Sequence, residues 1–513
     1  MTTTSEPKTK SVQSQALVLI IGRVASFALT FFIPIFLARR LDPAEYGTFK
    51  QIFLIFTTLF LILQGGMVQS LYYFIPHDPD RKSAWIFQAV LFATAAGAIA
   101  AIGLLLGGER LADAFSNPAL IPYISALALF LFLMLASCHF ETVMIAQEEI
   151  TKGSIVLFLS EMIRALFIII PLLVTRSLSA VIAGLITFAG LRLLISLIYT
   201  ARILFRGAGV RTPLFEPESL RMQLAYALPF GASVIVDVIQ QNLHQYTVAA
   251  LFDAATFAVY SVGIMQIPII DFIYTPTTQV LMVRMTALLK QGSIQDRLTL
   301  WHNVTAQLAL LFFPLGLFFG LIAPDMIGFL FTEAYKQSIP LFQISALGIL
   351  PAVFLTDGML RCHARIPFIL FTTIVKIILT FLLILPLVHF AGLTGAVLAT
   401  ILVVYIGKVL MLWKTRALMS VSWREFLPWG KLAGTLLLAS FVFIPAMLLR
   451  QAFSMSSFIA LIFDTLFYWT IYAAILFWTP LLPPAMREKV IATVDRLIHA
   501  VKGTKGGIKG EAC

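Results

Sequence analysis

The chain has 513 residues, of which 60% are hydrophobic and only 12% are charged, and its formal net charge is +11. Together with a mean hydropathy of +0.94, this composition excludes a soluble globular protein and indicates a membrane protein. Its three cysteines, Cys138, Cys362 and Cys513, share no close spacing, so we expect neither a disulfide framework nor a metal site.

Apolar runs long enough to cross a bilayer recur from one end of the chain to the other. Because these runs are continuous rather than alternating, they predict an all-α polytopic membrane protein with about 14 transmembrane helices. The expected spans are 15–38, 48–75, 84–107, 119–145, 154–175, 178–201, 223–250, 255–281, 302–323, 338–359, 366–389, 393–413, 431–449 and 457–482.

The positions of the basic residues predict the orientation of these spans. If the N-terminus is cytoplasmic, 24 lysines and arginines fall in cytoplasmic segments and six fall on the opposite side. Cytoplasmic loops carry the basic excess in membrane proteins, so we expect both termini to be cytoplasmic. The same asymmetry explains the net positive charge without a nucleic-acid partner. The six basic residues expected outside are Arg39, Arg40, Arg110, Arg176, Lys336 and Arg450.

Short matches indicate an internal repeat. Residues 41–44 (LDPA) resemble 252–255 (FDAA), residues 124–127 (ISAL) recur unchanged at 344–347, and an offset of 216 carries Arg192 onto Lys408. These matches predict two parallel six-helix halves, with the last two spans outside the repeat. The expected domains are an N-terminal six-helix bundle at 1–203, a cytoplasmic linker at 204–222, a C-terminal six-helix bundle at 223–413, the extra helices 13 and 14 at 414–482, and a cytoplasmic amphipathic helix with a basic tail at 483–513.

Three basic residues, Arg23, Arg164 and Lys376, are expected deep within spans. An arginine or lysine there costs about 2.5–3.5 kcal/mol on insertion scales. We therefore expect them to face a cavity and to bind an anionic substrate. Arg164 has an alternative, since Glu161 lies three residues earlier and can neutralise it. Arg192 is expected nearer an interface, where snorkelling to water is the favoured interpretation.

The most polar stretch within any span is VDVIQQNLHQY at 236–246. Asp237, Gln241 and His244 fall on one helical face in this stretch. They are candidates for a hydrogen-bonding surface that contacts a substrate, with Gln241 and His244 as substrate-binding residues. Asp237 is a candidate for binding a coupling proton or sodium ion, as are Glu161 and Asp271. The alternative is a polar seam packed between helices.

Five stretches carry a resemblance to a known family. They are 21–49 (IGRVASFALTFFIPIFLARRLDPAEYGTF), 63–76 (LQGGMVQSLYYFIP), 220–235 (LRMQLAYALPFGASVI), 322–351 and 391–400 (AGLTGAVLAT). Over spans 1 to 12 the chain resembles the oligosaccharide flippases, the polysaccharide-export branch of the multidrug/oligosaccharidyl-lipid/polysaccharide exporter superfamily. The resemblance implies two six-helix bundles around a cavity that opens alternately to each side. It also implies transfer of undecaprenyl-diphosphate-linked oligosaccharide across the bacterial cytoplasmic membrane for cell-surface polysaccharide synthesis.

The leading hypothesis is therefore a flippase and not an enzyme, with no catalytic residues, cofactor or metal. Its expected partners are the lipid-linked oligosaccharide, the lipid bilayer, and a polysaccharide polymerase with its export machinery. One alternative is an ion-coupled multidrug exporter, which usually has 12 spans and a less cationic cavity. Another is a membrane glycan polymerase or ligase, which needs a sizeable outside loop, whereas the longest one expected here, 324–337, has 14 residues.

Overall fold

The computed structural model describes residues 31–206, 213–452, 455–484, 487–488 and 492, so Arg23 lies outside the described residues. The described residues form α-helices joined by short turns and 3-10 segments, with no strand among them. The all-α polytopic class is confirmed.

After a helix whose described residues are 31–40, the α-helices are α2 Pro43–Leu63, α3 Met67–His77, α4 Lys82–Ala114, α5 Ile124–Ala136, α6 Phe140–Ala146, α7 Ile150–Thr175, α8 Leu178–Arg206, α9 Pro217–Leu251, α10 Ala254–Gly263, α11 Ile269–Gln291, α12 Ile294–Leu330, α13 Ser338–Ala346, α14 Thr356–Cys362, α15 Ile366–Met419, α16 Trp423–Phe426, α17 Trp429–Ala452 and α18 Ser457–Trp478.

Among the described residues, 11 helical segments are long and apolar enough to cross a membrane. One of them, the 54-residue α15, contains two expected spans, and its helical geometry is interrupted at Gly392 (φ 57°, ψ −136°). The expected span 255–281 is instead divided between α10 and α11. The first expected span, 15–38, lies largely outside the described residues. These differences account for the lower number of helices that meet the criterion for a span.

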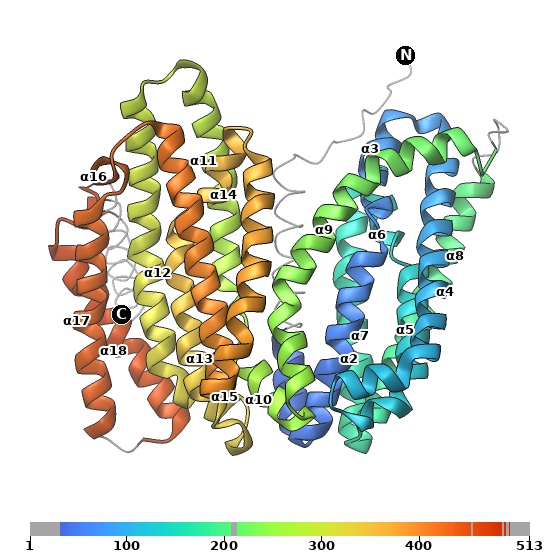
Figure 1. The fold of residues 1–513 in the computed structure, drawn as a ribbon, viewed down its shortest axis with the longest axis horizontal. Helices are drawn as coiled ribbons and strands as arrows, with labels where there is room; N and C mark the ends of the chain where they lie inside the picture. The colour runs from blue at the N-terminus through green and yellow to red at the C-terminus, as the bar shows by residue number, and fades with distance from the viewer. Residues whose placement is uncertain (1–30, 207–212, 453–454, 485–486, 489–491, 493–513) are drawn as a thin grey trace, which may run out of the picture. The chain divides into compact units, whose positions relative to one another are not determined.

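The helices form two compact units. Unit 1 consists of the described residues of Met1–Pro268 with Leu330–Phe342 and Ile366–Gly407. Unit 2 consists of the described residues of Ile269–Phe329, Gln343–Arg365 and Lys408–Cys513. Within unit 1, α2 packs on α10 and α9, and α7 packs on α8; within unit 2, α17 packs on α18 (Figure 1). The domain boundaries expected from the sequence stay a prediction.

The repeated motif after spans 1 and 7 has the same local structure in both places. Asp42 and Asp253 are N-caps in extended conformation, and each accepts a hydrogen bond of 2.8 Å from a backbone N–H three residues later. The helices that they begin, α2 and α10, pack in close contact. A Cβ atom on Gly47 would lie 1.7 Å from the carbonyl oxygen of Ala254, so only glycine permits this approach.

Within unit 1, a break between α2 and α3 brings the chain close to α9. Gly65 and Gly66 both have positive φ angles, +55° and +77°. A Cβ atom on Gly231 of α9 would lie 2.6 Å from the carbonyl oxygen of Gly65. Glycines on both sides of this crossing therefore let the α2–α3 break contact α9 directly.

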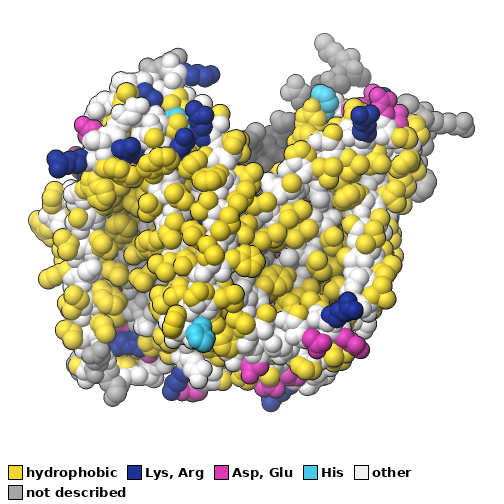
Figure 2. Space-filling view, viewed as in Figure 1, with side chains coloured by type: hydrophobic (Ala, Val, Ile, Leu, Met, Phe, Trp, Pro, Cys, Tyr) yellow, Lys and Arg dark blue, Asp and Glu magenta, His cyan; other side chains and the backbone are white. Residues whose placement is uncertain are grey.

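The surface fits a membrane environment. On the face shown in Figure 2, apolar side chains cover the middle of the helices, and charged side chains gather near the helix ends. This distribution keeps the charged groups near water and places the apolar ones against lipid.

Candidate transport site

Several polar side chains of α9 fix this helix to its neighbours in unit 1. Asn242 donates to the hydroxyl of Thr58 on α2 at 3.1 Å, and Tyr246 donates to the backbone carbonyl of Leu54 at 3.4 Å. The Nδ1 atom of His244 lies 2.8 Å from the hydroxyl of Tyr260 on α10. This part of the 236–246 stretch is a polar seam between helices, which was the alternative interpretation.

A second group on α9 is oriented differently. Asp237 and Gln241 are exposed, whereas Gln240 accepts a hydrogen bond of 3.0 Å from the ammonium group of Lys376 on α15. Asp237, Gln240 and Gln241 occupy positions i, i+3 and i+4, which share one side of a helix. We call Asp237, Gln240, Gln241 and Lys376 the α9 polar face. The structure thus brings Lys376 to the stretch that the sequence had singled out.

The aliphatic part of Lys376 is packed against a small residue. A Cβ atom on Gly407 would lie 2.8 Å from its Cδ atom, so a side chain there would displace the lysine. The half-buried Lys376 is therefore held in place by α15 itself while its ammonium group reaches α9.

The α9 polar face lies far from both ends of α9, and this position indicates what surrounds it. Asp237 lies 20 residues after the first residue of α9 and 14 before the last. At 1.5 Å per residue, these separations are about 30 and 21 Å. An exposed carboxylate so far from both helix ends is too costly against lipid, so this face borders water or polar groups.

The other residues proposed from the sequence lie elsewhere. Arg164 forms an ion pair with Glu161 on α7, which confirms the local pairing that their spacing predicted. Asp271 is exposed in the first turn of α11 in unit 2. Their roles in binding substrate or ions, like those of the α9 residues, stay predictions.

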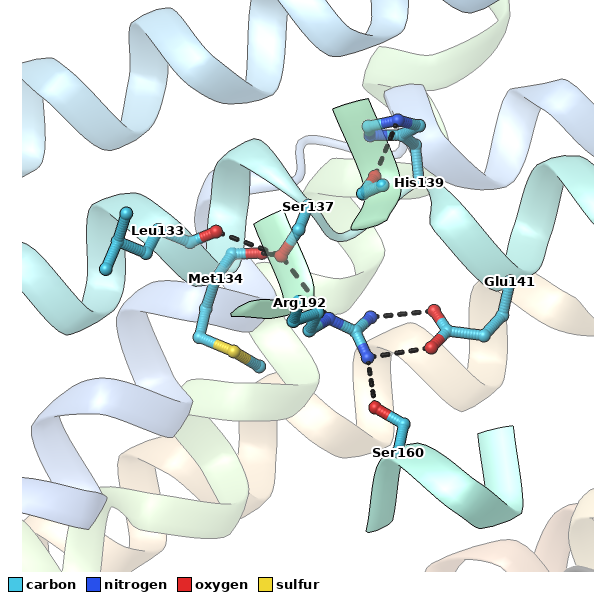
Figure 3. A network of polar contacts seen from close by, with 8 residues as sticks. Leu133, Met134, Ser137, His139, Glu141, Ser160 and Arg192 are labelled. Atoms are coloured by element: carbon cyan, nitrogen blue, oxygen red, sulfur yellow. Dashed lines mark hydrogen bonds and ion pairs between the residues drawn. The ribbon is translucent and has the colours of Figure 1, made fainter. Parts of the chain in front are cut away.

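Arg192 is not a snorkelling residue, so that interpretation was wrong. Its guanidinium group forms two hydrogen bonds of 2.7 Å to the two carboxylate oxygens of Glu141, and the two side chains are only 11% and 10% exposed. The guanidinium also donates to the hydroxyls of Ser160 at 2.7 Å and Ser137 at 3.3 Å (Figure 3). The cluster of Arg192, Glu141, Ser160 and Ser137 joins α6, α7 and α8, and the buried partners remove any need for the arginine to reach water.

A related cluster lies in unit 2 at equivalent positions of the repeat. The offset of 216 that relates Arg192 to Lys408 also relates Glu141 to Asp357. Lys408 donates to the carbonyl oxygen of Phe354 at 2.9 Å and to the hydroxyl of Thr356 at 3.4 Å. Its ammonium group lies 5.9 Å from the ring centre of Tyr274, and the Tyr274 hydroxyl donates to Asp357. The sequence contained a signal for both clusters. The offset of 216 relates a pair of acidic residues as well as a pair of basic ones.

Unit 2 contains another buried charge group. Arg450 of α17 forms an ion pair with Asp325 of α12, and it donates to the carbonyl oxygen of Leu321. Asp464 of α18 is also buried, with 1% of its surface exposed.

Polar and charged side chains inside apolar helical spans occur in membrane transporters, and solved transporter structures have a similar fold. The structure is similar to "Lipid II flippase MurJ, inward closed conformation", with a TM-score of 0.65 at 13% identity over 89% of this chain and 97% of that one. It is also similar to a MOP superfamily transporter from Pyrococcus furiosus, with a TM-score of 0.54 at 15% identity over 81% and 99%. A variant of the Vibrio cholerae MATE transporter VcmN matches with a TM-score of 0.52 at 12% identity over 81% and 97%.

A match between the sequence and a family model shows to which family the chain belongs. The model of the polysaccharide biosynthesis protein family matches residues 36–340, which is more than half of the chain. No curated protein matches the chain at a significant level. The chain belongs to the polysaccharide biosynthesis protein family and has the fold of the flippases and transporters described above.

Proposed function

We propose that this protein is a flippase that moves an undecaprenyl-diphosphate-linked oligosaccharide across the bacterial cytoplasmic membrane by alternating access, for cell-surface polysaccharide synthesis. The observation that carries the proposal is the family match over residues 36–340 on a fold shared with nearly the whole of a lipid II flippase. Family membership supports a glycan substrate, and the name of the similar structure supports a lipid carrier. Both termini would be cytoplasmic, and a polysaccharide polymerase would use the product outside.

The α9 polar face supports this chemistry. Lys376 would supply positive charge for the diphosphate, as would Arg23 and Arg164. Gln241, with His244 close by on the same helix, would hydrogen-bond to sugar hydroxyls. Asp237, Glu161 and Asp271 are the proposed sites of ion coupling, because carboxylates within spans mark proton and cation pathways.

A multidrug exporter is the second candidate, since a MATE transporter has a similar fold. The flippase is favoured because the family match is to polysaccharide biosynthesis proteins and because the lipid II flippase aligns over more of this chain, 89% against 81%. A glycan polymerase or ligase is the third candidate and belongs to a different class of protein.

Deleting the gene and locating the lipid-linked oligosaccharide tests the proposal. We expect the oligosaccharide to be made but to stay in the cytoplasmic leaflet, protected in intact cells from a membrane-impermeant glycosidase. Accumulation of single unpolymerised units in the outer leaflet would instead identify a polymerase. Normal export in the deletion strain, with loss of resistance to cationic drugs, would identify a multidrug exporter.

A further inference from the structure

One buried carboxyl group in unit 2 has no hydrogen-bond partner on one of its oxygen atoms. Asp464 is the only charged residue of α18, and its side chain is almost completely buried. Its Oδ2 atom forms no hydrogen bond within the described part of the chain. A carboxylate that is buried without a partner is far more costly than a neutral carboxylic acid in the same place. The structure therefore requires something that neutralises this group.

Two tyrosines fix the position of α18 along α12. The hydroxyl of Tyr472 donates to the carbonyl oxygen of Leu310 at 2.8 Å, and the hydroxyl of Tyr468 donates to that of Pro314 at 3.1 Å. The residue numbers rise along one helix as they fall along the other, so the two helices are antiparallel. Asp464 precedes Tyr468 by four residues on the same helical face, so it faces α12 about one turn beyond Pro314.

A further contact follows the same register. A Cβ atom on Gly328 of α12 would lie 3.5 Å from the hydroxyl of Ser457, the first residue of α18. The segment of α18 that holds Asp464 therefore packs against the segment of α12 that precedes Gly328 and contains Asp325. Arg450, the ion-pair partner of Asp325, belongs to α17, which also packs on α18.

These three helices bring two carboxyl groups and one guanidinium group together, and we call Asp325, Arg450 and Asp464 the charge triad. Arginine keeps its charge in proteins, and two neighbouring carboxylates disfavour each other's ionised form. The fully ionised triad would carry one negative charge in excess, and a single proton removes it. The other titratable side chains of α18 that face α12, Tyr468 and Tyr472, are engaged with backbone carbonyl groups.

We propose that the charge triad is a proton-binding site, at which Asp464 takes up a proton from water while Arg450 stays paired with Asp325. The proton forms an O–H bond with one carboxylate oxygen of Asp464 and returns to water on release, so no other covalent bond changes. Without the proton, Asp464 is an anion that competes with Asp325 for Arg450. Proton uptake and release therefore select between two pairings of the arginine.

The charge triad is connected to water through its ion pair. The side chains of Arg450 and Asp325 are 21% and 12% exposed. On the predicted orientation, Arg450 is one of the six basic residues outside, and Asp325 lies in the expected outside loop 324–337. The proton would therefore exchange with water on the outer side. None of the three residues belongs to the ion-coupling set proposed above, so the charge triad is a separate site.

Infrared difference spectroscopy of the purified full-length protein in nanodiscs tests the proposal, because a protonated carboxyl group has a C=O stretching band that a carboxylate lacks. At neutral pH, we expect a band that is present in the wild type, is missing in Asp464→Asn and shifts in heavy water. The matched control is Asp253→Asn, since Asp253 is an exposed N-cap and its replacement should leave the band unchanged.

A second variant tests whether the two carboxyl groups share the arginine. Asp325→Asn releases Arg450, which can then pair with Asp464 and stabilise its carboxylate. We expect the Asp464 band at neutral pH to weaken about tenfold in this variant, because a neighbouring opposite charge favours the ionised form.

Three results would overturn the proposal. A wild-type spectrum equal to that of Asp464→Asn would mean that Asp464 is ionised. A band that responds neither to heavy water nor to Asp325→Asn would belong to a fixed, isolated acid and not to the charge triad. A band that appears only when sodium ions are replaced by choline would identify a metal cation as the occupant.

A transport measurement separates the proton site from the proposed function. If the protein is the flippase proposed above, acidifying the outer side of proteoliposomes should change the rate of oligosaccharide transfer in the wild type and in Asp253→Asn but not in Asp464→Asn. Transfer by a wild type that lacks the band would overturn the proton site alone. The band in a folded protein that transfers no oligosaccharide would overturn the proposed function alone.

Discussion

Two clusters at equivalent positions of the internal repeat use the same signs of charge in different ways. In unit 1, Arg192 and Glu141 satisfy each other through two parallel hydrogen bonds and are almost fully buried. In unit 2, Lys408 bonds to a backbone carbonyl and a hydroxyl, while Asp357 accepts from Tyr274. The first cluster is a closed, directional clamp between three helices, whereas in the second the hydrogen bonds described above join Lys408 and Asp357 to neutral groups. The repeat therefore conserves the position of the charges more strictly than the way they are paired.

The largest effect is expected from opening the clamp. Glu141→Gln leaves the buried guanidinium of Arg192 without its counter-charge, so we expect a loss of about 3–5 kcal/mol in the free energy of unfolding. Denaturant titration of the purified protein in detergent micelles measures it. The control is Glu149→Gln, which breaks the exposed Glu149–Lys152 pair and should cost no more than about 1 kcal/mol. Equal stability of the two variants would mean that the clamp contributes no more than a surface ion pair.

An exchange of the two basic residues tests whether the clusters differ in geometry. Arg192→Lys loses the paired hydrogen bonds and should cost about 1.5–3 kcal/mol, the value of hydrogen bonds to charged groups. Lys408→Arg keeps the charge where the known partners are neutral oxygen atoms, so we expect a smaller loss. The same denaturant titration measures both variants. A larger loss in the free energy of unfolding for Lys408→Arg than for Arg192→Lys would contradict the proposed difference between the two clusters.

The smallest change in stability is expected at the helix N-caps, where both halves of the repeat use an aspartate in the same way. Asp253 lies between spans, and its hydrogen bond from the Thr256 backbone N–H lowers the pKa of its carboxyl below the ordinary 3.8. A lowered pKa means that the cap stabilises the folded protein above pH 3.8, and that this contribution fades as the pH falls further. Asp253→Asn keeps the cap and should change stability at pH 7 by less than about 0.5 kcal/mol. Titrations at pH 7 and pH 3 should show a weaker pH dependence in this variant, and an unchanged one would mean that Asp253 does not contribute to it.

The sequence predicted the helices and part of the site, for a physical reason. Long apolar runs define spans because the bilayer requires them, and Glu161 reaches Arg164 because residues three apart on a helix are neighbours. Partners on different helices have no such spacing. Glu141 and Arg192 are 51 residues apart, and Gln240 and Lys376 are 136 apart. Their meeting depends on how the helices pack, so the snorkelling interpretation of Arg192 failed and the partner of Lys376 was not found.

The two lysines of α15 now have different expected roles. Lys376 belongs to the α9 polar face, whereas Lys408 belongs to the cluster with Tyr274 and Asp357. We therefore expect Lys376 to be needed mainly for transport and Lys408 mainly for stability.

The most direct test of the proposed function is reconstituted transfer of an undecaprenyl-diphosphate-linked oligosaccharide in proteoliposomes. Transfer is followed as the fraction of oligosaccharide that becomes accessible to a glycosidase on the opposite side. We predict transfer by the wild type and at least a tenfold slower rate in Lys376→Gln, with the free energy of unfolding nearly unchanged. Absence of transfer in the folded wild type would contradict the flippase proposal, and wild-type rates in Lys376→Gln would remove the α9 polar face from the transport pathway.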